Sequence, residues 1–140
     1  MCPTVCVKDG EAKFSVGASG ANHIVPCTMQ LTAFLIDYGL SLEDAFNLPR
    51  IDVNETDLIT VDPILGEETI NQLGRHFKIN VAQNLVFPKL YSCPSGVYRD
   101  NKTGKTYGIS DKNSPTSGAV SEGLHDFTEK SQVISKVPRA

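Results

Sequence analysis

The feature that most constrains the fold lies at the start of the chain, where two β-strand patterns lead into a glycine-containing loop and then a helix pattern. Residues Pro3–Val7 and Ala12–Val16 have β character, and Asp9-Gly10 between them readily takes the positive φ angles of a two-residue hairpin turn. The loop that follows opens onto a helix N-terminus, where free N–H groups and the helix dipole favour an anion or a developing oxyanion. The sequence therefore predicts a hairpin that delivers backbone donors to the start of a helix.

The helix after this loop is predicted to face the core, because apolar residues recur at helical spacing. Pro26 lies in the first turn, where its missing N–H is tolerated, and Gly39 suits the C′ position. The apolar positions are Ile24, Cys27, Leu31, Phe34, Leu35 and Tyr38.

Two further helices and five strands complete the predicted pattern. Ser41-Leu-Glu-Asp44 is a capping box, with Asp in place of Glu, for a short helix that Pro49 ends, and a third helix is expected over Glu67–Leu73. The five strands are expected at Leu58–Val61, Phe77–Val81, Gly96–Tyr98, Thr106–Ile109 and Gly118–Leu124. The pattern predicts an α+β fold with one domain over residues 1–125 and a frayed polar tail over residues 126–140.

Composition excludes several classes of partner. The chain has 140 residues, of which 40% are hydrophobic, and a chain of this size buries about two thirds of its unfolded surface. Its net charge of −3 and scattered basic residues argue against a nucleic-acid surface. Because no apolar run has the length of a membrane span and no signal-peptide pattern opens the chain, we expect no membrane contact and, for the chain as written, a cytoplasmic location.

The spacing of the cysteines and histidines argues against a Cys2–Cys6 disulfide and against a metal site. In a strand over residues 3–7, Cys2 and Cys6 are about four rises of 3.3 Å apart, beyond the roughly 7 Å Cα separation of a disulfide. Both are expected on one strand face as small buried hydrophobes. The remaining members of these two residue types are Cys27, Cys93, His23, His76 and His125. None of them has the paired spacing of a zinc site, and we expect no cofactor of any kind.

Cys2 raises one alternative. Removal of Met1 would make it N-terminal, and it would then imitate a cysteine-type N-terminal nucleophile. Pro3 follows it immediately, which disfavours that role.

Five segments, in order, resemble the C-terminal region of the small subunit of γ-glutamyltransferases (glutathione hydrolases), a family of N-terminal-nucleophile hydrolases that includes cephalosporin acylase-like members. The opening Met-Cys-Pro-Thr-Val is similar to the family's Met-Ser-Pro-Thr-Ile strand, and residues 17–24 are similar to its Gly-Ser-Pro-Gly-Gly-Ser-Arg-Ile loop. Residues 43–50 resemble its Glu-Ala-Val-x-x-Pro-Arg segment. Residues 107–111 and 117–120 resemble its closing Gly-Ala-Ser-Asp-Pro-Arg and Gly-Gly-Ala-Ala strands. The order of the pieces makes the resemblance specific over roughly residues 1–124.

The resemblance implies a partial αββα sandwich, with an antiparallel sheet and helices packed on one face, and acyl transfer from γ-glutamyl compounds such as glutathione. The family's catalytic threonine lies in a Thr-Thr-His context, and its γ-glutamyl-binding serine pair and Asn-Asp-Asp-type segment accompany it; these 140 residues contain none of the three. The resemblance therefore implies a partner that bears the nucleophile, and leaves the substrate-binding residues of this chain unknown. Full-length relatives are often exported or membrane-anchored.

The family's oxyanion hole uses two adjacent glycines, and the matching positions are Gly20 and Ala21. Fixed backbone donors of this kind lower an acyl-transfer barrier by roughly 3 kcal/mol each. If the second position needs a positive φ, the Ala21 Cβ costs about 1 kcal/mol or more. The structural alternative is a simple strand-to-helix turn; phosphate binding is disfavoured because neither G-x-G-x-x-G nor G-K-[ST] occurs.

Two more positions bear on the same resemblance. Where the family has Asp-Pro-Arg, this chain has Asp111-Lys-Asn, which loses a guanidinium that Lys112 does not replace. Arg50 is retained and is predicted either to pair with Asp52 or Glu43 or to be solvated.

Two functional hypotheses remain open. The chain is either the distal segment of a γ-glutamyltransferase-like enzyme, or a non-catalytic truncated remnant that acts as a structural or interaction domain. In both, strands of the family architecture are missing, so open sheet surface must be covered by a partner or by a homodimer.

Overall fold

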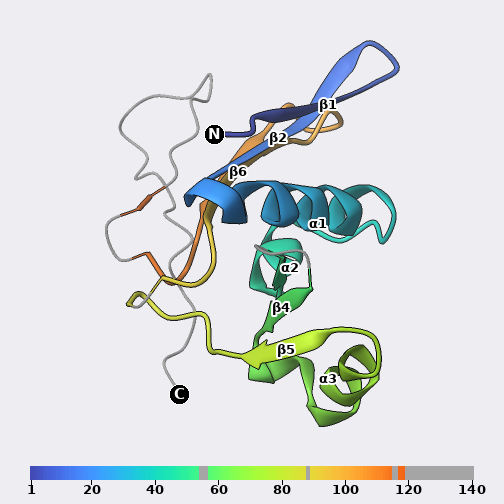
Figure 1. The fold of residues 1–140 in the computed structure, drawn as a ribbon. Helices are drawn as coiled ribbons and strands as arrows, with labels where there is room; N and C mark the ends of the chain where they lie inside the picture. Colours follow the sequence, from blue (N-terminus) through green and yellow to red (C-terminus); the bar gives the residue numbers. More distant parts are fainter. Residues whose placement is uncertain (54–56, 88, 115–116, 119–140) are drawn as a thin grey trace.

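The computed structural model describes residues 1–53, 57–87, 89–114 and 117–118 (Figure 1). The predicted strand at 118–124 runs into residues outside this described part, and so does the whole of the predicted tail at 126–140.

A four-stranded antiparallel sheet forms one side of the domain. Its strands are β1 (Thr4–Lys8), β2 (Glu11–Ser19), β6 (Cys93–Arg99) and β7 (Thr106–Ser110), in the order β1-β2-β6-β7. The predicted hairpin is confirmed: Asp9 and Gly10 have φ angles of 57° and 78°, the left-handed pair of a type I′ turn. β2 extends further than predicted and carries the chain directly to the glycine loop.

Two helices pack on one face of this sheet. They are α1 (Ile24–Ile36), which follows the 3-10 turn η1 (Ala21–His23), and α2 (Leu42–Asn47). The predicted cap of α2 is confirmed, because the Ser41 hydroxyl accepts the Asp44 N–H at 3.0 Å. The prediction that Tyr38 faces the core is wrong: α1 ends before it, and its ring is 72% exposed.

A smaller sheet lies on the other side of α1 and α2 (Figure 1). It contains β3 (Ile51–Val53), β4 (Leu58–Val61) and β5 (Lys78–Val81), with an antiparallel β3–β4 pair and a parallel β4–β5 pair. The parallel pair is possible because η2 (Pro63–Leu65) and α3 (Glu67–Gly74) form the crossover between its strands. Neither β3 nor the parallel pairing was predicted, since β3 has three residues and the local pattern does not encode strand direction.

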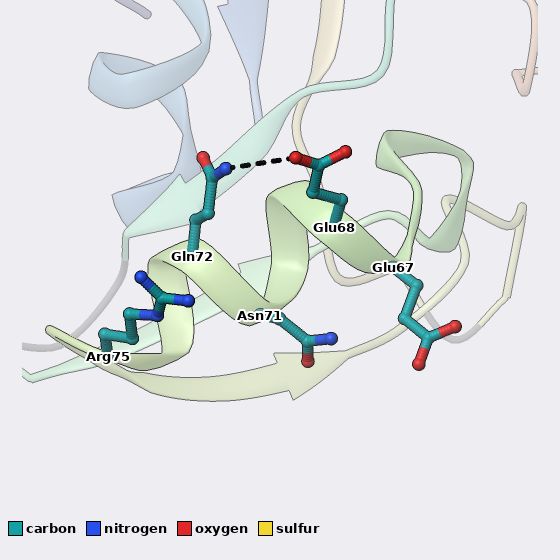
Figure 2. A pocket seen from close by; sticks show the side chains of 5 residues that line it. All are labelled: Glu67, Glu68, Asn71, Gln72 and Arg75. Carbon is teal, nitrogen blue, oxygen red and sulfur yellow. Dashed lines mark hydrogen bonds between the residues drawn. The ribbon is translucent and has the colours of Figure 1, made fainter.

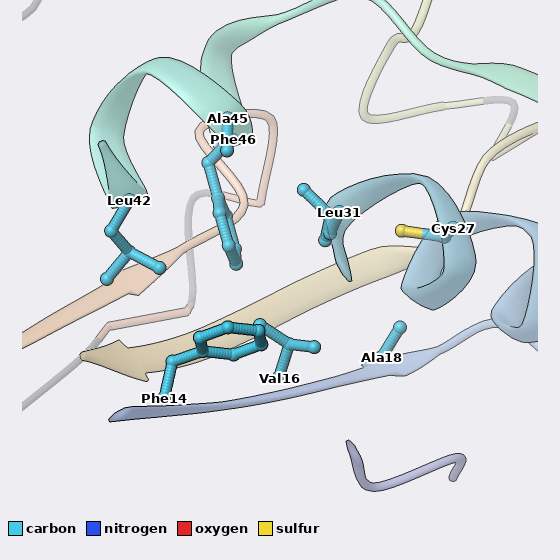
Figure 3. Close-up of a cluster of buried hydrophobic side chains, with 8 residues drawn as sticks. All are labelled: Phe14, Val16, Ala18, Cys27, Leu31, Leu42, Ala45 and Phe46. Atoms are coloured by element: carbon cyan, nitrogen blue, oxygen red, sulfur yellow. The ribbon is translucent and has the colours of Figure 1, made fainter. Parts of the chain in front are cut away.

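The hydrophobic core lies between the four-stranded sheet and the two helices (Figure 3). Its buried members are Phe14, Val16, Ala18, Cys27, Leu31, Leu42, Ala45 and Phe46. Gly96 on β6 makes the α2 contact possible, because a Cβ there would lie 2.9 Å from Cζ of Phe46. Alternate residues of β2 pack against one face of α1. This packing holds the helices on one face of the antiparallel sheet and gives the α+β fold.

Leu31 is the most deeply buried side chain of α1, with no exposed surface, so its truncation leaves a cavity. Leu31→Ala is expected to lower the free energy of unfolding by about 3 kcal/mol. Met29→Ala, on the exposed face of the same helix, is the control and is expected to change it by less than about 0.5 kcal/mol. Urea unfolding measures both; equal effects would contradict this packing.

Candidate functional site

The loop between β2 and α1 depends on one glycine for two physical reasons. Gly20 has a φ angle of 136°, which side chains rarely adopt. A Cβ at this position would also lie 3.0 Å from Cα and 3.1 Å from Cβ of Ser92, which immediately precedes β6. Gly20 therefore lets the end of β2 pack directly against the start of β6.

Ala21 adopts a left-handed backbone conformation, in which its Cβ causes strain. Its φ angle is 49°, which costs an L-residue with a Cβ about 1–2 kcal/mol. Its carbonyl accepts the Ile24 N–H, and the Gly20 carbonyl accepts the His23 N–H at 3.0 Å. Both carbonyls are thus used in the η1 turn, although the second position is not glycine.

The two residues that the sequence predicted as donors lie on the surface of this loop. Gly20 and Ala21 are both exposed. Within the described chain, neither N–H donates to a side chain or to the backbone of a turn or loop. The two predicted donor positions are therefore adjacent and solvent-accessible at the start of α1.

Buried polar side chains gather near this loop. They are Thr28, Arg50, Asp52, Asp62, Ser92 and Asp111, each at most 5% exposed. His23 Nδ1 lies 2.7 Å from Asp52 Oδ2, and Lys89 Nζ lies 2.9 Å from Asp111 Oδ2. Asp62 accepts the backbone N–H groups of Ile64 and Asn84 at 3.0 and 3.1 Å. Each buried carboxylate thus has its own donor.

Both predictions for Arg50 are wrong. The side chain is buried rather than solvated, with 5% of its surface exposed, and it forms no ion pair with Asp52 or Glu43 in the described chain. Asp52 is instead occupied by His23, and one terminal nitrogen of Arg50, Nη2, has no hydrogen-bond partner.

The buried cysteine and tyrosine of this region stay protonated at neutral pH. Burial raises the pKa of the Cys27 thiol, and the Arg50 charge and the Ser92 hydroxyl only partly oppose it. Burial, followed by the carboxylates of Asp62 and Asp52, raises the pKa of Tyr91 well above its usual range. Cys27 is therefore a core residue and not an activated nucleophile.

The other three cysteines are half-buried: Cys2, Cys6 and Cys93. No disulfide joins the four cysteines, all of which lie among the described residues. Cys2 precedes β1 instead of lying within it.

Among the described residues, no three metal-ligating side chains come together. No helix in that part of the chain is long and apolar enough to cross a bilayer.

A separate open pocket lies along α3, and Figure 2 shows that polar side chains line it. Glu67, Glu68, Asn71, Gln72 and Arg75 surround it, and Gln72 donates to Glu68 at 3.5 Å. α3 lies at the opposite end of the domain from β1 and β2 (Figure 1), so this pocket is not part of the glycine-loop region.

Comparison with known proteins assigns the fold and the order of these elements to one family. The family model described as Gamma-glutamyltranspeptidase matches residues 1–121. The chain belongs to the gamma-glutamyltranspeptidase family. The resemblance inferred from the five sequence segments is thereby confirmed.

Curated relatives match a shorter segment. The glutathione hydrolase proenzyme of Escherichia coli is 40% identical over 50 residues, which cover 36% of this chain and 9% of that protein. An acylase ACY 1 proenzyme of Pseudomonas sp. (strain V22) is 39% identical over 51 residues, with the same coverage of both chains. The matched segment is thus about a tenth of these relatives.

Solved structures share the fold over most of the chain. The gamma-glutamyltranspeptidase of Pseudomonas nitroreducens, complexed with L-DON, has a TM-score of 0.68 at 19% identity, covering 87% of this chain and 62% of that one. A cephalosporin acylase from Bacillus halodurans has a TM-score of 0.72 at 23% identity, covering 83% of this chain and 21% of that one.

Sequence reasoning missed the His23–Asp52 pair, because it treated histidines only as metal ligands and assigned Asp52 to Arg50. A usable signal was present: His23, Cys27 and Gln30 lie on one face of the helix at positions i, i+4 and i+7.

The left-handed conformation of Ala21 predicts that glycine is the better residue there. Ala21→Gly is expected to raise the free energy of unfolding by about 0.5–1 kcal/mol, since relief of about 1–2 kcal/mol of strain exceeds the added unfolded-state entropy. The same substitution at Ala33, inside α1, is the control and should lower it by about 1 kcal/mol. Gly20→Ala should also lower the free energy of unfolding. Urea unfolding in which Ala21→Gly lowers this free energy as much as Ala33→Gly does would contradict the left-handed conformation of Ala21.

Proposed function

We propose that this chain supplies the oxyanion-stabilising loop and half of the core of a γ-glutamyl acyl-transfer enzyme whose nucleophile lies outside these 140 residues. The observation that carries the proposal is the Gly20–Ala21 loop, in which both residues are exposed and both have a positive φ angle. Family membership and the order of the elements around the loop support it.

The chemistry assigned to the loop requires no particular side chain. Attack of a nucleophile on a γ-glutamyl carbonyl places negative charge on the carbonyl oxygen. The N–H groups of Gly20 and Ala21 are proposed to donate to that oxygen, and their position at the start of α1 adds the favourable end of the helix dipole. Cys27 does not supply an activated thiol, because it is buried and burial raises its pKa.

The outer face of the four-stranded sheet supports a requirement for more protein. Val5 pairs with Ser15, and Ser15 pairs with Val97, on the face opposite the buried Phe14 and Val16. Val5 and Val97 are 63% and 40% exposed. A second sheet in the segment that carries the nucleophile would cover this face, and a homodimer is the alternative cover. The alternative function is a purely structural, non-catalytic role.

The chain alone is expected to give no turnover of glutathione or of a chromogenic γ-glutamyl anilide. Cleavage of such an amide bond needs a nucleophile, which we propose lies outside these 140 residues. A continuous absorbance assay of the purified chain measures this, with buffer alone as the background. Turnover that exceeds background and survives Cys2→Ala would contradict the proposal. Turnover that disappears with Cys2→Ala would assign the nucleophile to an N-terminal cysteine instead.

A further inference from the structure

Asp111 attaches the end of β7 to the segment that leads into β6. It directly follows β7, and its side chain is 3% exposed. Its Oδ2 lies 2.9 Å from Lys89 Nζ, and its backbone N–H donates to the Pro94 carbonyl at 2.9 Å. One buried residue therefore holds the chain at two points, which lie on either side of Ser92.

The positive charge beside this carboxylate comes from Lys89 and not from the neighbouring Lys112. Lys112 Nζ lies 3.5 Å from the Asn47 carbonyl oxygen, on α2. The second carboxylate oxygen of Asp111, Oδ1, accepts the Asn113 N–H at 3.3 Å. Because a buried carboxylate that loses its counter-charge is strongly destabilised, the ion pair constrains where the segment around Lys89 can lie.

Ser92 lies between the two attachment points and touches the glycine loop. Its side chain does not anchor it, because Oγ is buried and has no hydrogen-bond partner among the described residues. Its backbone leaves no room at Gly20, where a Cβ would lie 3.0 Å from Cα of Ser92. Since closely packed groups transmit displacements, a shift of Ser92 reaches Gly20 directly.

We propose that the Lys89–Asp111 pair positions the Gly20–Ala21 loop through Ser92. This inference rests on the proposed function of the loop, and it makes Lys89 and Asp111 positioning residues for acyl transfer there. Neither side chain is assigned a contact with the substrate. Their effect on the reaction comes from the placement of the loop, and a misplacement of about 1 Å can lower an enzymatic rate about 100-fold.

A purely stabilising ion pair is the alternative. Ser19 pairs with Cys93 in the β2–β6 ladder, and this pairing alone would then hold Ser92 against Gly20. The two roles differ in the folded chain. If the ion pair positions the loop, breaking it changes the Gly20–Ser92 contact; if the ladder suffices, breaking it changes only the free energy of unfolding.

Nuclear magnetic resonance of the 140-residue chain distinguishes the two roles. The readout is the nuclear Overhauser effect between the Gly20 α-protons and the Ser92 β-protons, which falls steeply with their separation. Lys89→Met removes the ammonium group and keeps most of the aliphatic side chain. It is expected to weaken this effect several-fold and to shift the amide resonances of Gly20 and Ala21.

The chain offers a matched control in a second lysine–aspartate pair. Lys78 and Asp57 are 75% and 60% exposed, so Lys78→Met should leave the Gly20–Ser92 effect unchanged. Asp111→Asn removes the charge from the other side of the buried pair and should reproduce the result of Lys89→Met. Lys89→Arg keeps the positive charge and should restore most of the contact.

The proposal is overturned if the Gly20–Ser92 effect keeps its intensity in Lys89→Met and Asp111→Asn, or if Lys78→Met weakens it equally. The dispersion of the amide spectrum checks folding, and if Lys89→Met does not fold, Asp111→Asn and the milder Lys89→Gln decide. The measurement involves no turnover, so failure of the γ-glutamyl proposal would not alter it. An unchanged contact would in turn leave the γ-glutamyl proposal standing.

Discussion

The close approach of Gly20 to Ser92 is the contact on which the rest of the structure depends. It joins the end of β2 to the start of β6, and there is no room between them for a Cβ. Because β2 continues directly into η1 and α1, this contact lies next to the point where the helix begins. The hydrophobic core below follows from the same placement, since alternate residues of β2 pack against α1.

Buried charge is arranged around this junction in pairs. His23 with Asp52 and Lys89 with Asp111 tie the helix and the loop before β6 to segments distant in sequence. Burying charges costs free energy, so such pairs are weak sources of stability and are better explained by the positions they specify. Arg50 is the exception, because it is buried and its Nη2 has no hydrogen-bond partner among the described residues.

The sequence predicted the elements whose signal is local. Asp9-Gly10, the Ser41 cap and the spacing of Leu31 with its neighbours each act within a few residues, and the structure confirms all three. It did not predict β3, the parallel β4–β5 pair or the partner of Asp52, because each depends on contacts between distant segments. Tyr38 was misassigned for a related reason: helical spacing continues past the residue where α1 ends. The glycine loop joins β2 to the first helix, as turn chemistry and family resemblance both predicted, and its role as an oxyanion hole stays a prediction.

The central claim is that the Gly20–Ala21 loop can serve as an acyl-transfer oxyanion site when a nucleophile is supplied. The most direct measurement is γ-glutamyl anilide turnover by a chimaera of the Escherichia coli glutathione hydrolase in which the segment corresponding to residues 1–50 is taken from this chain. We expect the chimaera to turn over the anilide, and we expect Gly20→Ala to lower that turnover on the order of 100-fold because it disturbs the loop. A chimaera that folds and matures but shows no turnover, or turnover that Gly20→Ala leaves unchanged, would contradict it.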